Sequence, residues 1–477
     1  LRVIKHSFII ASLQDILPQT DVEMLKRVDL GKEAILPLIL KMSWPSIVAM
    51  IAMSVYNFID SFWLARLSPQ ALAALTVCFP VQMIFAAIGV GTGVGAGSFS
   101  ARMFGSGKNM KAQQAAGQIF FLSFTFGLTI IVCVLLFPDH ILRLFGATKE
   151  ILPLCRKYLL IIIFSSPFLI FSMMSNNLLR AEGRPLLSMY VVLTASITSA
   201  VLDPFLIFGF WIFPQMGIKG AAVASLCAQF ISFLFSVNFL CLKSSKYELS
   251  RKYFRPNLSI INSIFSTGFP SIISHLIISL VLIVYNHVLA QYGSPAIAAL
   301  GICFRVNGLV MMILFGIGFG LMPIVGYSHG AGLYQRLRQA VFAAIKASVS
   351  VAVFSTIILT IFADFIVAVF SNDPVLTAIA VPALRIYVLL LLFLAPTLVF
   401  INMFLGLGKG ALTMFIFLFR DTVLLIPLLL FLSRFAGITG VWMAMPIANF
   451  FTFFLTFYYA RREIKKFKSW ERNRQIP

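Results

Sequence analysis

The stretch from Trp44 to Gly107 decides the fold, because the chain contains it twice. The first copy opens with Trp44-Pro45-Ser46-Ile47, and the second opens 225 positions later with Phe269-Pro270-Ser271-Ile272. The same offset relates Ala73-Ala74-Leu75 to Ala298-Ala299-Leu300, Cys78-Phe79 to Cys303-Phe304, and the glycines Gly91, Gly93, Gly95, Gly105 and Gly107 to Gly316, Gly318, Gly320, Gly330 and Gly332. A constant offset over so many positions indicates an internal duplication.

The composition places the chain in a membrane. Of its 477 residues, 60% are hydrophobic and only 11% are charged, whereas soluble domains have about 25% charged residues. A membrane-spanning helix needs about 20 apolar residues, and we identify twelve stretches of this kind. They are Leu36–Leu64, Ala71–Gly97, Gly117–Phe137, Tyr158–Leu179, Leu186–Trp211, Gly220–Leu242, Ile260–Ala290, Ala296–Tyr327, Ala340–Ala363, Ala378–Gly406, Ala411–Leu432 and Val441–Tyr459.

Six helices in each half would bring each half back to the side on which it started. The two copies are then parallel repeats about an axis along the membrane normal. We therefore predict an all-α integral membrane protein with twelve transmembrane helices in two six-helix parallel repeats. The expected parts are a cytoplasmic leader at 1–33, a first lobe at 34–242, a linker at 243–257, a second lobe at 258–460 and a basic tail at 461–477.

The distribution of charge predicts the orientation. The net charge is +21, and most of the 37 Lys and Arg residues lie on the side that holds the termini and the linker. An excess of Lys and Arg marks the cytoplasmic side. We expect a multi-pass protein of the inner or plasma membrane with both termini in the cytoplasm and with a tail that contacts anionic lipid. Because the basic residues gather in loops and tails, we expect no nucleic-acid partner.

Carboxylates inside the apolar stretches are the strongest functional candidates, since a charge in hydrocarbon costs at least about 2.5–3.5 kcal/mol. Asp60, Asp203 and Asp421 fall in such stretches. Asp421 directly follows Arg420, so two other interpretations remain for it: a structural ion pair with Arg420, or a position near the membrane surface. For Asp60 and Asp203, the alternative interpretation is a helix end in water.

Polar side chains accompany both remaining carboxylates at helical spacing. Met53, Tyr56 and Asn57 share a helix face with Asp60, and Ser196 and Ser199 share one with Asp203. Pro204 in addition frees the carbonyl of Ala200. The pattern predicts a cation-coupling site made by Asp60, Asp203, Asn57 and Ser199.

No enzyme motif is present in the sequence. The glycine ladders lack the Lys and Ser or Thr of a phosphate-binding loop, and glycines in an apolar helix instead allow close packing. We expect no enzymatic activity, no cofactor and no metal other than a possible Na⁺ between Asp60 and Asp203. Without a nucleotide site, transport would have to draw on an ion gradient.

Several motifs together resemble the multidrug and toxic compound extrusion (MATE) family, over nearly the whole chain. These motifs are Val55-Tyr56-Asn57-Phe58-Ile59-Asp60, Ala65-Arg66-Leu67-Ser68-Pro69, Ala101-Arg102-Met103-Phe104-Gly105-Ser106-Gly107-Lys108, Leu178-Leu179-Arg180-Ala181-Glu182-Gly183, Leu202-Asp203-Pro204 and Gly217-Ile218-Lys219-Gly220-Ala221-Ala222. The resemblance implies two six-helix lobes around a V-shaped cavity and efflux of drugs or metabolites in exchange for Na⁺ or H⁺.

The resemblance also implies roles for single residues. In the prokaryotic branch with an acidic pair in the first lobe, the functional aspartates match Asp60 and Asp203. That branch commonly has Asn where this chain has Ser199. Other branches use a carboxylate in the seventh helix, which this chain lacks. We expect a monomer whose small-molecule substrates are drugs or amphipathic, often cationic, compounds, in a cavity lined by Tyr56, Met53, Ser225, Asn176 and Asn177.

The chemistry of the predicted site favours H⁺ over Na⁺. Burial favours the neutral form of a carboxyl group, and two nearby carboxyl groups titrate as a unit. A Na⁺ ion needs several well-placed oxygens, and Ser199 reaches less far than the amide usual in this branch.

Two other classes stay open at this point. A lipid-linked oligosaccharide or lipid flippase of the same superfamily would have a more cationic cavity and often extra helices. A non-transporting scaffold or receptor would have no need of intramembrane carboxylates.

Overall fold

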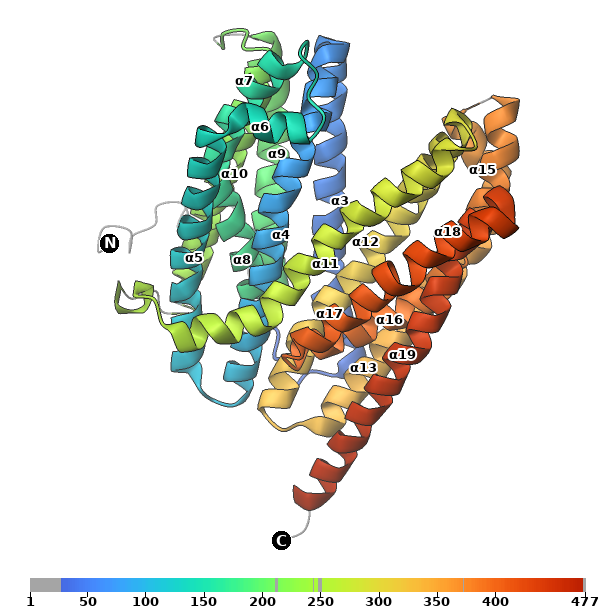
Figure 1. Cartoon of the computed structure of the whole chain (residues 1–477). Helices are drawn as coiled ribbons and strands as arrows, with labels where there is room; N and C mark the ends of the chain where they lie inside the picture. Colours follow the sequence, from blue (N-terminus) through green and yellow to red (C-terminus); the bar gives the residue numbers. More distant parts are fainter. Residues whose placement is uncertain (1–26, 211–212, 243, 248–250, 372, 475–477) are drawn as a thin grey trace.

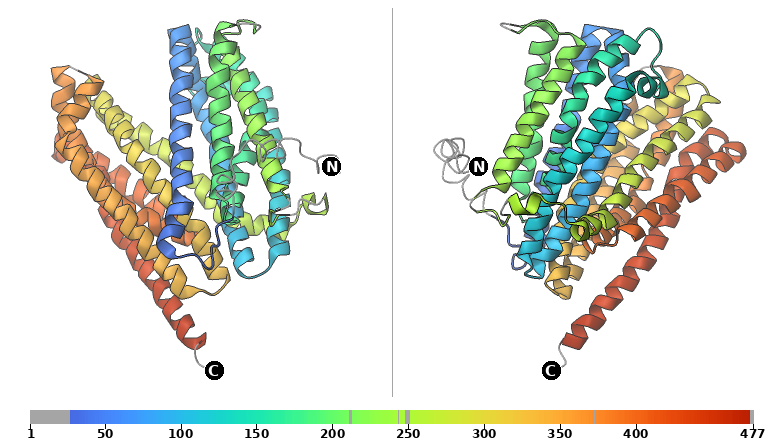
Figure 2. Two further views of the ribbon diagram at one scale, coloured as in Figure 1. Left: turned by 180° about the vertical axis from the view of Figure 1, so that it is seen from behind. Right: turned by 60° about the vertical axis from the view of Figure 1, so that its left-hand side comes forward.

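A computed structural model describes residues 27–210, 213–242, 244–247, 251–371 and 373–474. Two bundles of helices meet at one end of the molecule and diverge at the other, which makes a V (Figure 1). The views in Figure 2 show the same divergence from two further directions. Most of the predicted leader at 1–33, parts of the predicted linker at 243 and 248–250, and the last residues of the predicted tail, 475–477, lie outside the described residues.

The first lobe contains the helices of the first repeat. Its elements are α3 (Ile35–Leu67), α4 (Pro69–Gly105), α5 (Asn109–Leu136), α6 (Pro138–Leu144), α7 (Leu152–Ile162), η2 (Ile163–Ser165), α8 (Ser166–Ala181), α9 (Pro185–Phe208) and α10 (Ile218–Leu240). The short helix η3 (Arg251–Phe254) belongs to the linker. Ser68 caps α4, because its Oγ accepts the Ala71 N–H at 3.1 Å, and Pro69 follows as the first helical residue. This explains the sharp turn between α3 and α4.

The second lobe repeats this order. Its elements are α11 (Leu258–Ala290), α12 (Ser294–Gly330), α13 (Tyr334–Ile361), α14 (Ala363–Phe370), α15 (Pro374–Tyr387), α16 (Leu390–Gly406), α17 (Gly410–Leu418), η4 (Phe419–Leu425), α18 (Ile426–Phe435) and α19 (Gly437–Arg474). The helix η4 is a π-helix. The helix α19 runs without a break past the predicted border between lobe and tail at 460.

Among the described residues, ten helices or helix series are long and apolar enough to cross a membrane. The pair α15 and α16, bent by 42°, makes an eleventh span. The helix α11, with 33 residues, has apolar portions at Leu258–Ser274 and Leu280–Ala290 and takes the place of the twelfth. The predicted architecture of twelve helices in two lobes is confirmed.

Backbone geometry repeats along with the sequence. Gly107 and Gly332, 225 positions apart, have φ of 73° and 69°, and Gly183 and Gly408, with the same offset, have φ of 86° and 78°. Glycine ends helices in this left-handed conformation because it has no Cβ to clash. The two copies therefore end equivalent helices in the same way.

The glycine ladders lie where the two lobes touch. A Cβ on Gly95 of α4 would lie 3.0 Å from the backbone nitrogen of Gly268 on α11. A Cβ on Gly320 of α12 would lie 2.6 Å from the Ser43 hydroxyl on α3. Each ladder thus lets a helix of one lobe approach the backbone of the other, which confirms the packing interpretation of these glycines.

The linker is tied to the first lobe through one buried carboxylate. Glu182, after α8, accepts hydrogen bonds from the Lys246 N–H at 2.7 Å and from the Ser245 hydroxyl at 3.0 Å. Arg27, ahead of α3, also reaches Glu182 at 2.8 Å. The linker and the segment before α3 are therefore held at the same point, where α8 ends.

Candidate functional site

Asp60 and Asp203 lie inside the first lobe. Asp60 is on α3, with 5% of its surface exposed, and Asp203 is on α9 and fully buried. The helices α3 and α9 pack against each other, which brings the two carboxylates close enough to interact electrostatically. These positions exclude the alternative that both aspartates sit at helix ends in water.

Three of the four oxygens of the two carboxylates lack a hydrogen-bond partner among the described residues. Asp203 Oδ1 and Oδ2 and Asp60 Oδ1 are buried and make no hydrogen bond within the described part of the chain. Burying an ionised carboxylate without a partner is far more costly than burying a neutral group. The pair is therefore suited to hold an exchangeable positive charge, a proton or a metal cation.

Neutral oxygens surround the pair. The Tyr56 hydroxyl lies 3.1 Å from the Ser225 hydroxyl and within electrostatic range of both aspartates. Ser199 Oγ is buried near Tyr56 but has no hydrogen-bond partner of normal geometry among the described residues. A Na⁺ ion here would depend on two carboxylates and on these hydroxyls. The described residues contain no group of three or more His, Cys, Asp and Glu side chains that could hold a metal ion.

A cavity of about 120 Å³ lies inside the first lobe, and Tyr56 and Asn57, about one helical turn before Asp60, are part of its lining. This is space for several water molecules or part of a small organic molecule. Its walls combine neutral polar side chains with methionines and aromatic rings: Met53, Tyr56, Asn57, Gln82, Met83, Phe85, Ser172, Met173, Asn176, Ser196, Ser225 and Gln229 are among them. The described lining contains no Asp, Glu, Lys or Arg, so shape and hydrogen bonding decide what fits.

The predicted cavity residues divide into two groups. Met53, Tyr56, Asn176 and Ser225 line this cavity, and so does Asn57, which was predicted as a coupling residue. Asn57 is exposed, whereas the other three predicted coupling residues are buried.

Asn177 lies outside the cavity lining. It is buried, accepts a hydrogen bond from Arg180 at 2.9 Å and faces Gly93 on α4. We therefore assign it a packing role between α8 and α4.

Sequence reasoning missed three polar residues of this site. Gln82 donates to the Tyr158 hydroxyl at 3.1 Å, and Gln229 lines the cavity from α10. Tyr158 is fully buried and within electrostatic range of Asp60. Gln82 and Gln229 could have been noticed because an amide is unusual inside an apolar stretch. The sequence does not reveal, however, whether the side chain faces the cavity, which depends on how the helices pack.

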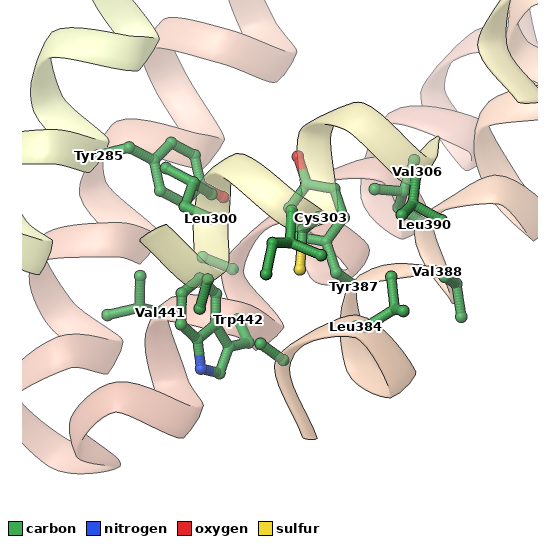
Figure 3. Close-up of a cluster of buried hydrophobic side chains, with 14 of the residues drawn as sticks. Tyr285, Leu300, Cys303, Val306, Leu384, Tyr387, Val388, Leu390, Val441 and Trp442 are labelled. Carbon is green, nitrogen blue, oxygen red and sulfur yellow. The ribbon is translucent and has the colours of Figure 1, made fainter. Parts of the chain in front are cut away.

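The second lobe lacks an equivalent acidic pair. Tyr285 stands 225 positions after Asp60 and is fully buried, with no hydrogen-bond partner for its hydroxyl among the described residues. Figure 3 shows it with Cys303, Tyr387 and Trp442 in a packed apolar cluster. The two copies therefore differ at this position, with a carboxylate in the first lobe and a tyrosine in the second.

Asp421 forms a structural ion pair. Two nitrogens of the Arg420 guanidinium reach its two oxygens at 2.8 and 2.9 Å, and both side chains are buried. Both residues lie in the π-helix η4. Because Arg420 occupies both oxygens, Asp421 is not available as a second coupling carboxylate in this conformation.

Two repeated lobes, a V-shaped body and carboxylates buried inside apolar helices are typical of membrane transporters. A family profile described as MatE matches residues 45–205 and again residues 270–431. The chain belongs to the MATE family of efflux transporters. The two matches begin 225 positions apart, as the internal duplication requires.

Individual relatives agree with this assignment. The chain is 27% identical over 433 residues to the FAD transporter of Shewanella oneidensis, covering 89% of this chain and 94% of the relative. It is also 27% identical over 421 residues to the multidrug export protein MepA of Staphylococcus aureus strain MRSA252, covering 88% of this chain and 92% of the relative.

Solved structures agree as well. An outward-facing multidrug resistance MATE family transporter of the MOP superfamily matches with a TM-score of 0.87 and 26% identity, over 93% of this chain and 99% of that one. A MOP superfamily transporter from Pyrococcus furiosus matches with a TM-score of 0.86, 26% identity and the same coverage.

Proposed function

We propose that this chain is a secondary active antiporter that exports drugs or other amphipathic, often cationic, small molecules in exchange for an ion. The observation that carries the proposal is the pair of buried carboxylates, Asp60 and Asp203, three of whose oxygens lack a hydrogen-bond partner among the described residues, in the lobe that holds the cavity. The relatives named for multidrug export support the same class of substrate. The lining of methionines, aromatic rings and amides suits substrates of varied shape, since thioether and amide side chains adapt to different surfaces.

The proposed coupling ion is H⁺. Two neighbouring carboxylates deprived of water gain most from sharing or binding a proton, which needs no coordination shell. A Na⁺ ion would need several oxygens to replace its water. Ser199 and Tyr56 are neutral oxygens near the pair, but they add little beyond the carboxylates themselves.

The proposed cycle is an exchange. The end where the lobes meet faces the cytoplasm, in line with the excess of Lys and Arg there, and the V opens outward. A proton from outside neutralises the acidic pair, α3 and α9 change their packing, and the substrate leaves outward. Release of the proton to the cytoplasm restores the anionic pair. The protein works as a monomer in the inner or plasma membrane.

Efflux from proteoliposomes with a single imposed gradient tests this proposal. A fluorescent lipophilic cation is loaded, and either a pH gradient or a Na⁺ gradient is applied while the other is collapsed. We expect the pH gradient alone to drive transport. Transport driven by Na⁺ alone would overturn the choice of ion, and passive loss alone under both gradients would overturn antiport.

A flavin nucleotide is the second candidate substrate. The relative from Shewanella oneidensis is named an FAD transporter, and the cavity offers the amides of Gln82, Asn176 and Gln229. Amides match the donor and acceptor edges of a flat heteroaromatic ring. The same liposomes loaded with FAD test this candidate, and gradient-dependent release of FAD but not of the lipophilic cation would favour it.

A further inference from the structure

The last helix continues well beyond the membrane. With 38 residues, α19 is about 57 Å long at 1.5 Å per residue, whereas the hydrocarbon core is about 30 Å thick and the whole bilayer about 40–45 Å. Figure 1 shows its end projecting past the other helices at the end of the molecule where the lobes meet. Part of α19 therefore lies at the level of the lipid headgroups.

One face of α19 changes from aromatic to basic along its length. Phe450, Phe454 and Phe457 are exposed, and so are Arg461, Lys465 and Lys468. At 3.6 residues per turn these six residues fall within a sector of about 80°. The row thus passes from side chains that suit acyl chains to side chains that suit headgroups, and Arg462 extends the basic part on one side.

The basic side chains on this face are not neutralised by the protein. Arg461, Arg462, Lys465 and Lys468 make no ion pair with the described residues, in contrast to Lys466, which pairs with Glu463 at 3.1 Å. Uncompensated cations this close together repel one another. Negative charge from outside the chain would relieve this repulsion.

The opposite face of the same segment fixes its orientation. Phe467 is 1% exposed and stacks on Tyr334 with ring centroids 5.7 Å apart. Glu463 pairs with Lys409 at 2.5 Å, and Glu471 pairs with Arg338 at 2.9 Å. With this face docked on the second lobe, α19 cannot rotate its basic face away from the membrane surface.

We infer that Arg461, Arg462, Lys465 and Lys468 form a binding site for the phosphate headgroups of acidic phospholipids. The acyl chains of the same lipids would lie along Phe450, Phe454 and Phe457. Long basic side chains can reach back toward the membrane surface from a helix that leaves it. The site is independent of the coupling ion and of which side of the membrane is cytoplasmic.

Titration with phosphatidylglycerol tests this inference. The full-length protein in neutral detergent is titrated with this lipid, and bound lipid is counted by native mass spectrometry. Each Lys or Arg near an acidic lipid surface strengthens binding about fivefold, so Arg461→Gln with Lys465→Gln should weaken it on the order of twentyfold. The matched control is Lys108→Gln with Lys111→Gln, which removes two exposed cations at the start of α5 and should leave the affinity unchanged.

Further arms separate the possible outcomes. Phosphatidylcholine should bind no more weakly to the Arg461 and Lys465 double variant than to the unaltered chain, and inorganic phosphate should not displace phosphatidylglycerol. Equal melting temperatures of all three proteins in phosphatidylcholine nanodiscs would exclude misfolding as the cause. Equal loss of affinity in both double variants, no loss in either, or displacement by inorganic phosphate would each overturn the inference.

Discussion

Asp203 is fully buried on α9 while both of its oxygens lack a hydrogen-bond partner in the described structure. Such a group costs stability, and folded proteins keep it where function requires it. Asp60, its neighbour on α3, shares this property through Oδ1. The two aspartates are therefore better explained by ion coupling than by stability of the fold.

The first prediction follows from this cost. Asp60→Asn and Asp203→Asn should each reduce gradient-driven efflux to the level of protein-free liposomes, because neither amide can take up and release the coupling ion. Neither variant should lower the melting temperature, since a buried charge is removed. Efflux and thermal unfolding of the same preparations check this. Asp364→Asn is the control, because Asp364 is an exposed partner of Arg385 at 2.6 Å, and it should transport normally.

The Arg420–Asp421 pair predicts the opposite behaviour. Asp421→Asn leaves the Arg420 guanidinium buried without a counter-charge, which costs about 3–5 kcal/mol. The melting temperature of this variant should fall. Replacing both residues by Leu should restore most of the loss, since a buried ion pair is often no better than apolar packing. A double variant that is less stable than Asp421→Asn would show that the pair has a further role.

The residues of the site differ in how far sequence alone could predict them. Asp60 and Asp203 stand out because carboxylates are rare in apolar stretches. For Asp421 the sequence left two interpretations open, an ion pair with Arg420 or a place near the membrane surface. Only the structure could decide for the buried ion pair. Tyr158 and Gln82 were missed because their importance depends on which face of α7 and α4 is turned inward.

The helices meet between the lobes through glycine. The close approach of Gly95 on α4 to Gly268 on α11 leaves no room for a Cβ, whereas a Cβ on Gly308 of α12 would meet no atom within 4 Å. The repeat predicted both ladders from sequence. Which of their members touch the other lobe depends on the crossing of α4 and α11, which no pattern in the sequence reports.

This contrast gives a prediction for a helix interface. Gly95→Ala should destabilise the protein by about 1–3 kcal/mol, because the added methyl overpacks the contact. Gly308→Ala should stabilise it by about 0.5–1 kcal/mol, because Ala is the better helix former and meets open space. Chemical or thermal unfolding in the same detergent measures the change in stability of each variant. Equal changes in the two variants would contradict the geometry of the interface.

The whole molecule is a duplicated body whose first half alone carries the buried pair Asp60 and Asp203. Composition, spacing and the constant offset predicted twelve helices in two lobes, because membrane spans and repeats leave strong signals in a sequence. The angle between the two lobes could not be predicted from the sequence. It depends on contacts between α3, α4, α11 and α12, which differ between the conformations of a transporter.

The topology of the whole chain predicts the result of cysteine labelling. Ser244 in the linker and Ser294 at the start of α12 are both exposed, and α11 separates them. In a cysteine-free background, Ser244→Cys should react with a membrane-impermeant maleimide from the cytoplasmic side and Ser294→Cys from the outside. Reaction of both from one side would contradict the parallel arrangement of the repeats.

The central claim is that the acidic pair of the first lobe carries the coupling ion, and proton release on substrate binding tests it most directly. A transported cation is added to the purified protein in weakly buffered detergent, and the pH is followed while binding is measured in parallel. The unaltered protein should release protons as it binds, and the Asp60→Asn, Asp203→Asn double variant should bind without releasing any. Equal proton release by the double variant, or binding without proton release by the unaltered protein, would contradict the account.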